Sequence, residues 1–181
     1  MLTVGLLHSV LHTLILALSA SGRSVSGAEF GYHLSDTEFQ FSVSISDSWR
    51  FAQPTLYPAI PFEVLPETLP QPTTHTYFNI ATGELRQNSL DECFVIYSEA
   101  YKSIWQIESA RNIDFLGTPA KDMLVRRKIG DNLTKIRKIF TVRKSNNAMR
   151  VFVLSFSAPP NDYECYQAQF DVIWASIVFL S

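Results

Sequence analysis

Glycine is scarce in this chain of 181 residues, which has only seven, three of them within the first 28 positions. The four that remain cannot form a G-x-G-x-x-G or a G-x-x-x-x-G-K-[S/T] loop. Such loops cradle phosphate groups with backbone N–H groups at the start of a helix. The sequence therefore excludes the common glycine-rich nucleotide-binding loops.

Side chains that bind metals or act as nucleophiles are also few. Beyond residue 28 the chain has only the histidines His33 and His75 and the cysteines Cys93 and Cys165. Zinc-protease, C-x-x-C and G-x-S-x-G motifs are absent, so the common metal sites and the nucleophile elbow have no support. We expect no metal, no cofactor and no catalytic residue, and therefore a non-catalytic protein.

The chain begins with an apolar segment at residues 2–20, which is followed by small residues. This order is typical of a signal peptide, and we place it at residues 1–28 with cleavage after Ala28. No Lys or Arg precedes the apolar segment, and its length approaches the ~20 residues that span a bilayer, so an uncleaved membrane anchor is the alternative. We predict an exported protein (periplasmic, secreted or lumenal), membrane-anchored if the leader is retained. Residues 29–181 then form a single domain.

Two covalent features depend on this export. Exported chains tend to oxidise paired thiols, so one outcome is a disulfide between Cys93 and Cys165. The other outcome is that both thiols are free and buried on helix faces. The triplet Asn132-Leu133-Thr134 is a glycosylation sequon, which matters only if a eukaryotic secretory route is used.

Hydrophobic periodicity divides the domain into strands and two helices. Alternation of apolar and polar residues predicts a strand at Phe39–Ile45 and a short extended piece at Trp49 and Phe51. Six prolines between residues 53 and 75 predict a long irregular loop. Ser89 and Glu92 form a capping-box pattern for a helix over 89–105, and Asn161 is a good N-cap for a last helix. Four strands lie between these helices, at 107–115, 123–129, 135–143 and 150–157, and an extended tail follows at 178–180.

This order of elements predicts an α+β fold. A turn at Gly117–Ala120 follows the first of these four strands, and the next three, joined by short polar turns at Gly130–Asn132 and Ser145–Asn147, favour an antiparallel meander. The apolar stripes of the two helices need a sheet to cover. We therefore expect an antiparallel sheet with helices over its faces.

The same segments resemble PsbP/Mog1-like domains, a group that includes PsbP-like and DcrB-like proteins. The resemblance covers about residues 36–180. It implies an α/β/α sandwich around a central antiparallel sheet and a mostly non-enzymatic role, as in photosystem II extrinsic subunits, a Ran-GTPase-binding factor and bacterial envelope proteins. No binding residue is carried over from the family. The motifs are F-x-F-S-x-S-I-x-x-x-W at 39–49, N-I-D-F-L-G-T-P-A at 112–120, the strand at 151–156, A-P-P-N-x-Y at 158–163 and W-x-S-I-x-F at 174–179.

Basic residues are concentrated in the meander. Residues 121–150 hold ten of the fifteen Lys and Arg side chains against only Asp122 and Asp131. Alternation along the strand at 135–143 places Lys135 and Arg137 on one face, so we expect a basic, outward-facing surface. The alternative is that these charges protect an exposed strand from aggregation. The candidate contact residues are Arg126, Arg127, Lys128, Lys135, Arg137, Lys138 and Arg143.

Two functional hypotheses follow. The first is an exported, non-catalytic binding or assembly module that contacts a protein or an anionic surface through the basic meander. The alternative is a small-ligand carrier or hydrolase with a cavity beneath the 53–75 loop, in which His75 would take part. Nucleic acid is not expected as a partner, because the aromatic residues follow the core pattern and an exported protein rarely meets it.

Overall fold

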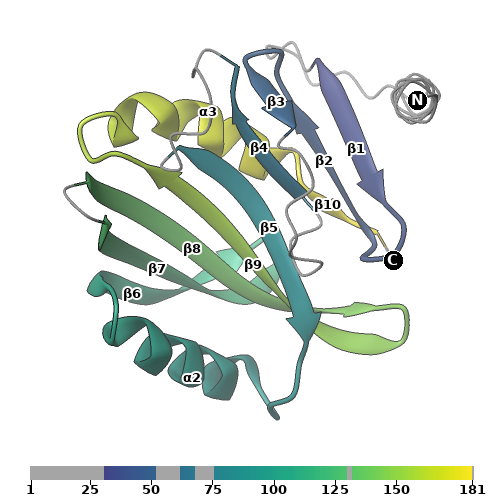
Figure 1. Cartoon of the computed structure of the whole chain (residues 1–181). Coiled ribbons are helices and arrows are strands. Elements are labelled where there is room, and N and C mark those ends of the chain that lie inside the picture. Colours follow the sequence, from purple (N-terminus) through teal and green to yellow (C-terminus); the bar gives the residue numbers. More distant parts are fainter. Residues whose placement is uncertain (1–30, 52–61, 68–75, 130–131, 181) are drawn as a thin grey trace, which may run out of the picture.

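The computed structural model describes residues 31–51, 62–67, 76–129 and 132–180, which contain ten strands and two helices (Figure 1). None of the helices in these ranges is long and apolar enough to span a bilayer. The predicted leader lies outside the described residues. In chain order the elements are β1 (Tyr32–Asp36), β2 (Phe41–Ile45), β3 (Trp49–Phe51), β4 (Phe62–Pro66), β5 (Tyr77–Glu84), α2 (Leu90–Lys102), β6 (Gln106–Phe115), β7 (Thr118–Ile129), β8 (Asn132–Ser145), β9 (Ala148–Ala158), α3 (Tyr163–Ala175) and β10 (Val178–Phe179).

The strands form two antiparallel sheets. The larger sheet has the order β3-β4-β5-β9-β8-β7-β6, and the smaller has the order β1-β2-β10. Every paired strand runs antiparallel to its neighbour. The predicted α+β class with a central antiparallel sheet is confirmed, β7 to β9 form the expected meander, and β6 extends it by one strand.

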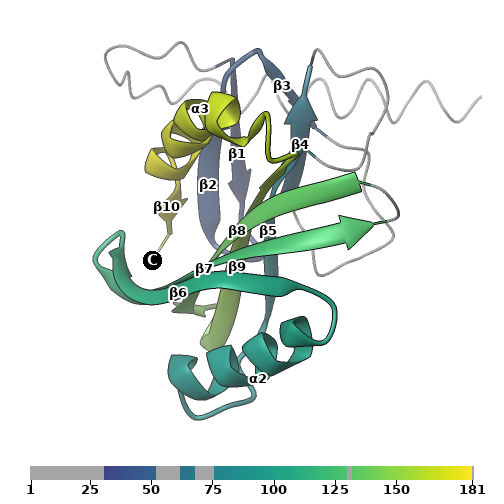
Figure 2. The same ribbon diagram turned by 90° about the vertical axis from the view of Figure 1, so that its left-hand side faces the viewer.

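One helix covers each face of the larger sheet, as Figure 2 shows. The α2 face buries Cys93 of the helix against Met123, Val125 and Phe140. On the α3 face the Phe170 ring is stacked on Phe156, with 3.9 Å between ring centroids. Both faces of the central strands are therefore buried in protein. A charged side chain on β7 or β8 consequently points toward the side of one of the two helices.

The predicted element order misses three strands. β5 pairs with β9 over eight residues, yet its sequence does not alternate, because Phe78, Asn79 and Ile80 are all buried in a strand covered on both faces. β4 lies within the segment predicted to be an irregular loop. Its Pro66 is the last residue of the strand, where a missing N–H is tolerated. β1 precedes the first predicted strand.

The turns of the meander are tighter than predicted. Asn146 and Asn147 have φ values of 48° and 64°, so both adopt the left-handed conformation that a two-residue hairpin requires. Leu116 and Gly117 likewise have positive φ. β7 therefore begins at Thr118, and the predicted turn at Gly117–Ala120 is two residues shorter than the pattern indicated.

The two helices differ in how they begin. Ser89 caps α2, and its side chain accepts a hydrogen bond from the backbone N–H of Glu92, as predicted. The N-cap of α3 is Asp162 rather than Asn161, and its side chain makes no capping hydrogen bond. Packing of Phe170, Ile173 and Trp174 against the sheet stabilises α3 instead.

The structure contains both cysteines as free thiols, with Cys93 buried and Cys165 exposed. Cys93 lies on α2 and Cys165 on α3, and the larger sheet separates these two helices (Figure 2). The Cys93–Cys165 disulfide is therefore wrong, because a disulfide requires Cα atoms about 4.4–6.8 Å apart. The alternative of two buried thiols holds only for Cys93.

Titration with Ellman's reagent under non-reducing conditions tests this assignment. We expect the native protein to react at Cys165 only, because burial shields Cys93 and raises the pKa of its thiol. Both thiols should react after unfolding in urea. If neither thiol reacts in urea, the two cysteines are bonded and the assignment is wrong.

Candidate functional site

The basic side chains of the meander divide between the two faces of the sheet. Successive residues of a strand point to opposite faces, so Arg137 lies on the α3 face and Lys138 on the α2 face. The ring of Trp174 in α3 lies 4.4 Å from the Arg137 guanidinium. The ring of Trp105, which follows α2, lies 5.2 Å from the Lys138 ammonium. The expectation of a single outward-facing basic surface is therefore wrong for part of the set.

A buried carboxylate organises the α3 face. Asp122 of β7 has a side chain only 6% exposed and lies directly opposite Arg111 of β6. Arg111 donates from Nε and Nη2 to Asp122 Oδ2 at 3.0 and 2.9 Å. Arg137 of β8 donates from Nε to Oδ1 at 2.9 Å and from Nη2 to Oδ2 at 3.0 Å. One carboxylate thus connects three neighbouring strands through four charge-assisted hydrogen bonds.

Further cations lie beside this cluster on the same face. Lys135 donates to Glu164 of α3 at 3.2 Å, and its ammonium lies 4.2 Å from the centroid of the Tyr163 ring. Arg126 forms an ion pair with Glu108 of β6, where the register shifts by a bulge. Lys128 is exposed. We use the name meander face for the five cations Arg111, Arg126, Lys128, Lys135 and Arg137.

An open cleft of about 220 Å³ lies in this face. Its floor is formed by the strands β6, β7 and β8, and its wall by the first turns of α3. The Arg111 side chain is 66% exposed, so the cleft presents a guanidinium to solvent. We call it the Asp122 cleft, and its lining consists of Ser109, Arg111, Asp122, Leu124, Lys135, Arg137, Tyr163, Glu164 and Gln167.

Two of the predicted contact residues have local structural roles. Arg143 donates from Nη2 to the backbone oxygens of Phe115 and Leu116 at 3.2 and 3.0 Å, and its guanidinium lies over the Phe179 ring. It thereby holds the β6–β7 turn against the C-terminal strand. Arg127 lies over the Trp105 ring on the opposite face from the cleft.

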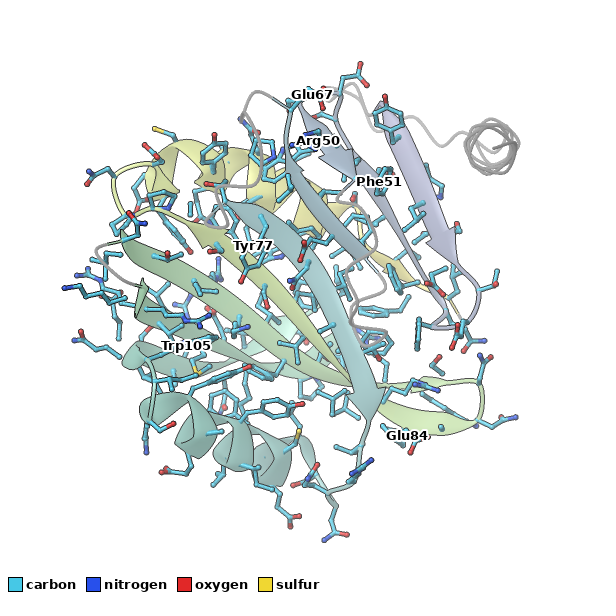
Figure 3. All side chains as sticks on the ribbon, in the orientation of Figure 1. Arg50, Phe51, Glu67, Tyr77, Glu84 and Trp105 are labelled. Carbon is cyan, nitrogen blue, oxygen red and sulfur yellow. The ribbon has the colours of Figure 1, made fainter. Side chains whose placement is uncertain are left out.

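Lys138 belongs to a polar row on the α2 face. Glu63, Asn79, Ser155 and Lys138 are successive cross-strand neighbours on β4, β5, β9 and β8. Asn79 donates to Glu63 at 3.2 Å, and Lys138 donates to Ser155 Oγ at 2.9 Å. Tyr77 and Trp105, labelled in Figure 3, lie on the same face. Lys138 is only 7% exposed, so burial is its dominant electrostatic feature.

This burial gives Lys138 an unusual acidity. Desolvation lowers the pKa of its ammonium from 10.5 to about 8, and the charge of Arg127 acts in the same direction. Burial raises the pKa of the neighbouring Tyr101 phenol to about 12. At neutral pH the folded protein therefore carries a costly buried charge, and among the described residues its hydrogen-bond partner is the neutral hydroxyl of Ser155.

We expect stability to rise between pH 8 and pH 10. In this window the unfolded chain keeps the Lys138 proton that the folded chain loses, so the free energy of unfolding increases with pH, by roughly 2–3 kcal/mol. Burial raises the pKa of both the Cys93 thiol and the Tyr101 phenol, so the unfolded chain ionises the thiol first from about pH 9 and the phenol first from about pH 10, and both oppose part of the increase. Urea unfolding across this range measures the effect.

The variant Lys138→Met should remove the increase and raise stability at pH 7, because it removes the buried charge. Lys144→Met is the matched control, since Lys144 is an exposed lysine on the same strand. We expect this control to keep the wild-type pH profile. Parallel profiles of wild type and Lys138→Met between pH 8 and pH 10 would show that Lys138 titrates normally.

The remaining predicted residues lie apart from the cleft. His33 Nδ1 on β1 is 3.0 Å from Ser44 Oγ on the neighbouring strand β2. Asn132 is exposed at the start of β8, where its glycosylation stays a prediction. His75 and most of the 53–75 segment, with the cavity expected beneath it, fall outside the described residues. Within the described ranges, no three His, Cys, Asp or Glu side chains cluster as metal ligands.

The sequence reading missed Arg111 and the central role of Asp122. Arg111 precedes the basic stretch at residues 121–150, and by composition Asp122 is only one of two acidic residues within that stretch. A signal for the pair was nevertheless present. A two-residue turn at Leu116 and Gly117 places residue 111 opposite residue 122, and opposite charges in that position favour an ion pair.

Comparison with known proteins identifies the fold. No family model and no curated protein matches the sequence. Among solved structures, LpqN of Mycobacterium tuberculosis, involved in cell envelope biogenesis, matches with a TM-score of 0.63 and 14% identity, over 78% of this chain and 83% of that one. Cyanobacterial PsbP (CyanoP) of Synechocystis sp. PCC 6803 matches with a TM-score of 0.57 and 11% identity, over 89% and 99%.

The Ran-binding protein Mog1p of Saccharomyces cerevisiae also matches, with a TM-score of 0.54 and 9% identity, over 84% of this chain and 97% of that one. These likenesses confirm that the chain has the PsbP/Mog1-like fold. At such low identity they carry no residue-level information about function.

Proposed function

We propose that this protein is an exported, non-catalytic binding module that contacts an anionic partner protein through the meander face. The observation that carries the proposal is the set of three cations that line the open Asp122 cleft, together with Arg126 and Lys128 on the same face of the sheet. Three carboxylates, Glu108, Asp122 and Glu164, oppose them, so the face keeps an excess of positive charge. Such a surface attracts acidic partners and increases their association rate.

Two further observations support this function. Mog1p is described as a Ran-binding protein, which gives one structure of this fold a protein partner. LpqN is described as involved in cell envelope biogenesis, which agrees with a leader at residues 1–28 and export.

Charge reversal on the meander face tests the proposal. The double variant Arg126→Glu/Lys128→Glu alters two exposed side chains and leaves the Asp122 cluster intact. The control Arg86→Glu/Lys102→Glu makes the same charge change at exposed positions before and at the end of α2. Tagged full-length proteins would be used to capture partners from an envelope extract of the source organism, with captured proteins quantified by mass spectrometry.

We expect the meander-face variant to lose at least one protein that wild type and control both retain, at unchanged thermal stability. The loss should deepen with decreasing salt in the wash, because weakly screened charges repel an acidic partner more strongly. Identical capture by all three proteins would contradict the proposed surface.

A further inference from the structure

The guanidinium groups of the Asp122 cleft have unused hydrogen-bonding capacity. Arg111 and Arg137 each direct Nε and Nη2 toward Asp122. A guanidinium has five N–H donors in a fixed plane. The Nη1 group of each arginine has no hydrogen-bond acceptor among the described residues, and Arg111 is largely exposed. The cluster therefore ends in donors that face solvent.

We propose that the Asp122 cleft binds one carboxylate side chain of an extended acidic segment in a partner protein. This inference rests on the proposed function and specifies the chemistry that the partner presents. Arginine donors match a carboxylate in geometry and bind it through charge-assisted hydrogen bonds. Lys135, at the α3 wall of the cleft, supplies a second kind of cation.

The charge of the cleft favours a single negative charge. Its lining has three cations, Arg111, Lys135 and Arg137, and two carboxylates, Asp122 and Glu164. One carboxylate neutralises the remaining positive charge. A doubly charged phosphate would bring more negative charge than the cleft has positive charge left. Asp122, on the floor of the cleft, would repel it. The balance therefore selects an Asp or Glu side chain over a phosphate group.

The groups that would receive this carboxylate are already held in place. Asp122 fixes both guanidinium groups, and the Trp174 ring packs on Arg137 at 4.4 Å. Glu164 and the Tyr163 ring hold Lys135. Preorganised side chains lose little conformational entropy on binding, which increases affinity. The ion cluster thus stabilises the fold and also holds the cations of the cleft in position for binding.

The position of β6 indicates why the ligand is an extended segment. β6 is the last strand of the larger sheet as described, and most of its ten residues are exposed. Its outer edge therefore offers backbone N–H and C=O groups for strand addition. Ser109 and Arg111 belong to this edge strand and also line the cleft. A segment paired along β6 would place alternate side chains over the cleft.

Nuclear magnetic resonance with a defined peptide tests the proposal. The probe is a capped peptide of about eight residues that alternates Thr and Glu, so that its carboxylates share one face when it is extended. The same peptide with Gln in place of Glu is the negative control. Full-length protein labelled with ¹⁵N gives one indole signal for each of its three tryptophans.

We expect the Glu peptide to shift the Trp174 indole, which packs on Arg137, together with backbone amides of β6. The Trp105 indole on the opposite face should not move. Arg111→Gln should weaken binding about tenfold, the effect of losing one charge-assisted contact. Arg86→Gln, at an exposed site remote from the cleft, should bind like wild type. Equal binding of the Gln peptide would overturn the carboxylate assignment.

Inorganic phosphate and lipid vesicles test two alternative ligands of these cations, a phosphate group and a lipid surface. Inorganic phosphate that shifts the same signals more strongly than the Glu peptide would overturn the selection for a single charge. Binding to phosphatidylglycerol vesicles without any peptide response would assign the cations to a lipid surface. If the peptide causes no shift while protein capture still depends on Arg126 and Lys128, this inference fails and the proposed function stands.

Discussion

The Asp122 carboxylate accepts charge-assisted hydrogen bonds from two arginines on the α3 face of the larger sheet. Strands β7 and β8 have a helix on each side, so each of their charged residues needs a partner or a route to solvent. Asp122 supplies that partner for Arg111 and Arg137 and joins β6, β7 and β8. Replacing Asp122, whose side chain is only 6% exposed, should cost about 3 kcal/mol, because both arginines would lose their shared acceptor. The geometry of the cleft depends on this interaction.

The cations on the two faces of the larger sheet have different surroundings. On the α3 face, carboxylates accept hydrogen bonds from Arg111, Lys135 and Arg137, and the cluster opens to solvent. On the α2 face, Lys138 has a serine hydroxyl and two aromatic rings as neighbours. The first arrangement holds positive charge in place where a partner can reach it. In the second arrangement the charge of Lys138 is buried and unfavourable, and the pKa of its ammonium is lowered accordingly.

Much of the fold was predictable because local patterns agree with it. The capping pair Ser89 and Glu92 and the alternation along β8 were read correctly. β5 was missed because a strand buried on both faces does not alternate. The site was predicted only in part, since alternation separates Arg137 from Lys138 but does not reveal that both faces are covered. That knowledge comes from the order of strands in the sheet, which brings α2 and α3 to opposite sides.

The central claim is that Asp122 and Arg137 stabilise each other within the folded protein. The direct test is a double-mutant cycle by urea unfolding with Asp122→Asn, Arg137→Met and the two combined. We expect each single change to cost several kcal/mol and the combined change to cost clearly less than their sum, with a coupling energy of about 1.5–3 kcal/mol. Additive single effects, with no coupling, would contradict the claim that this ion cluster organises the meander and its cleft.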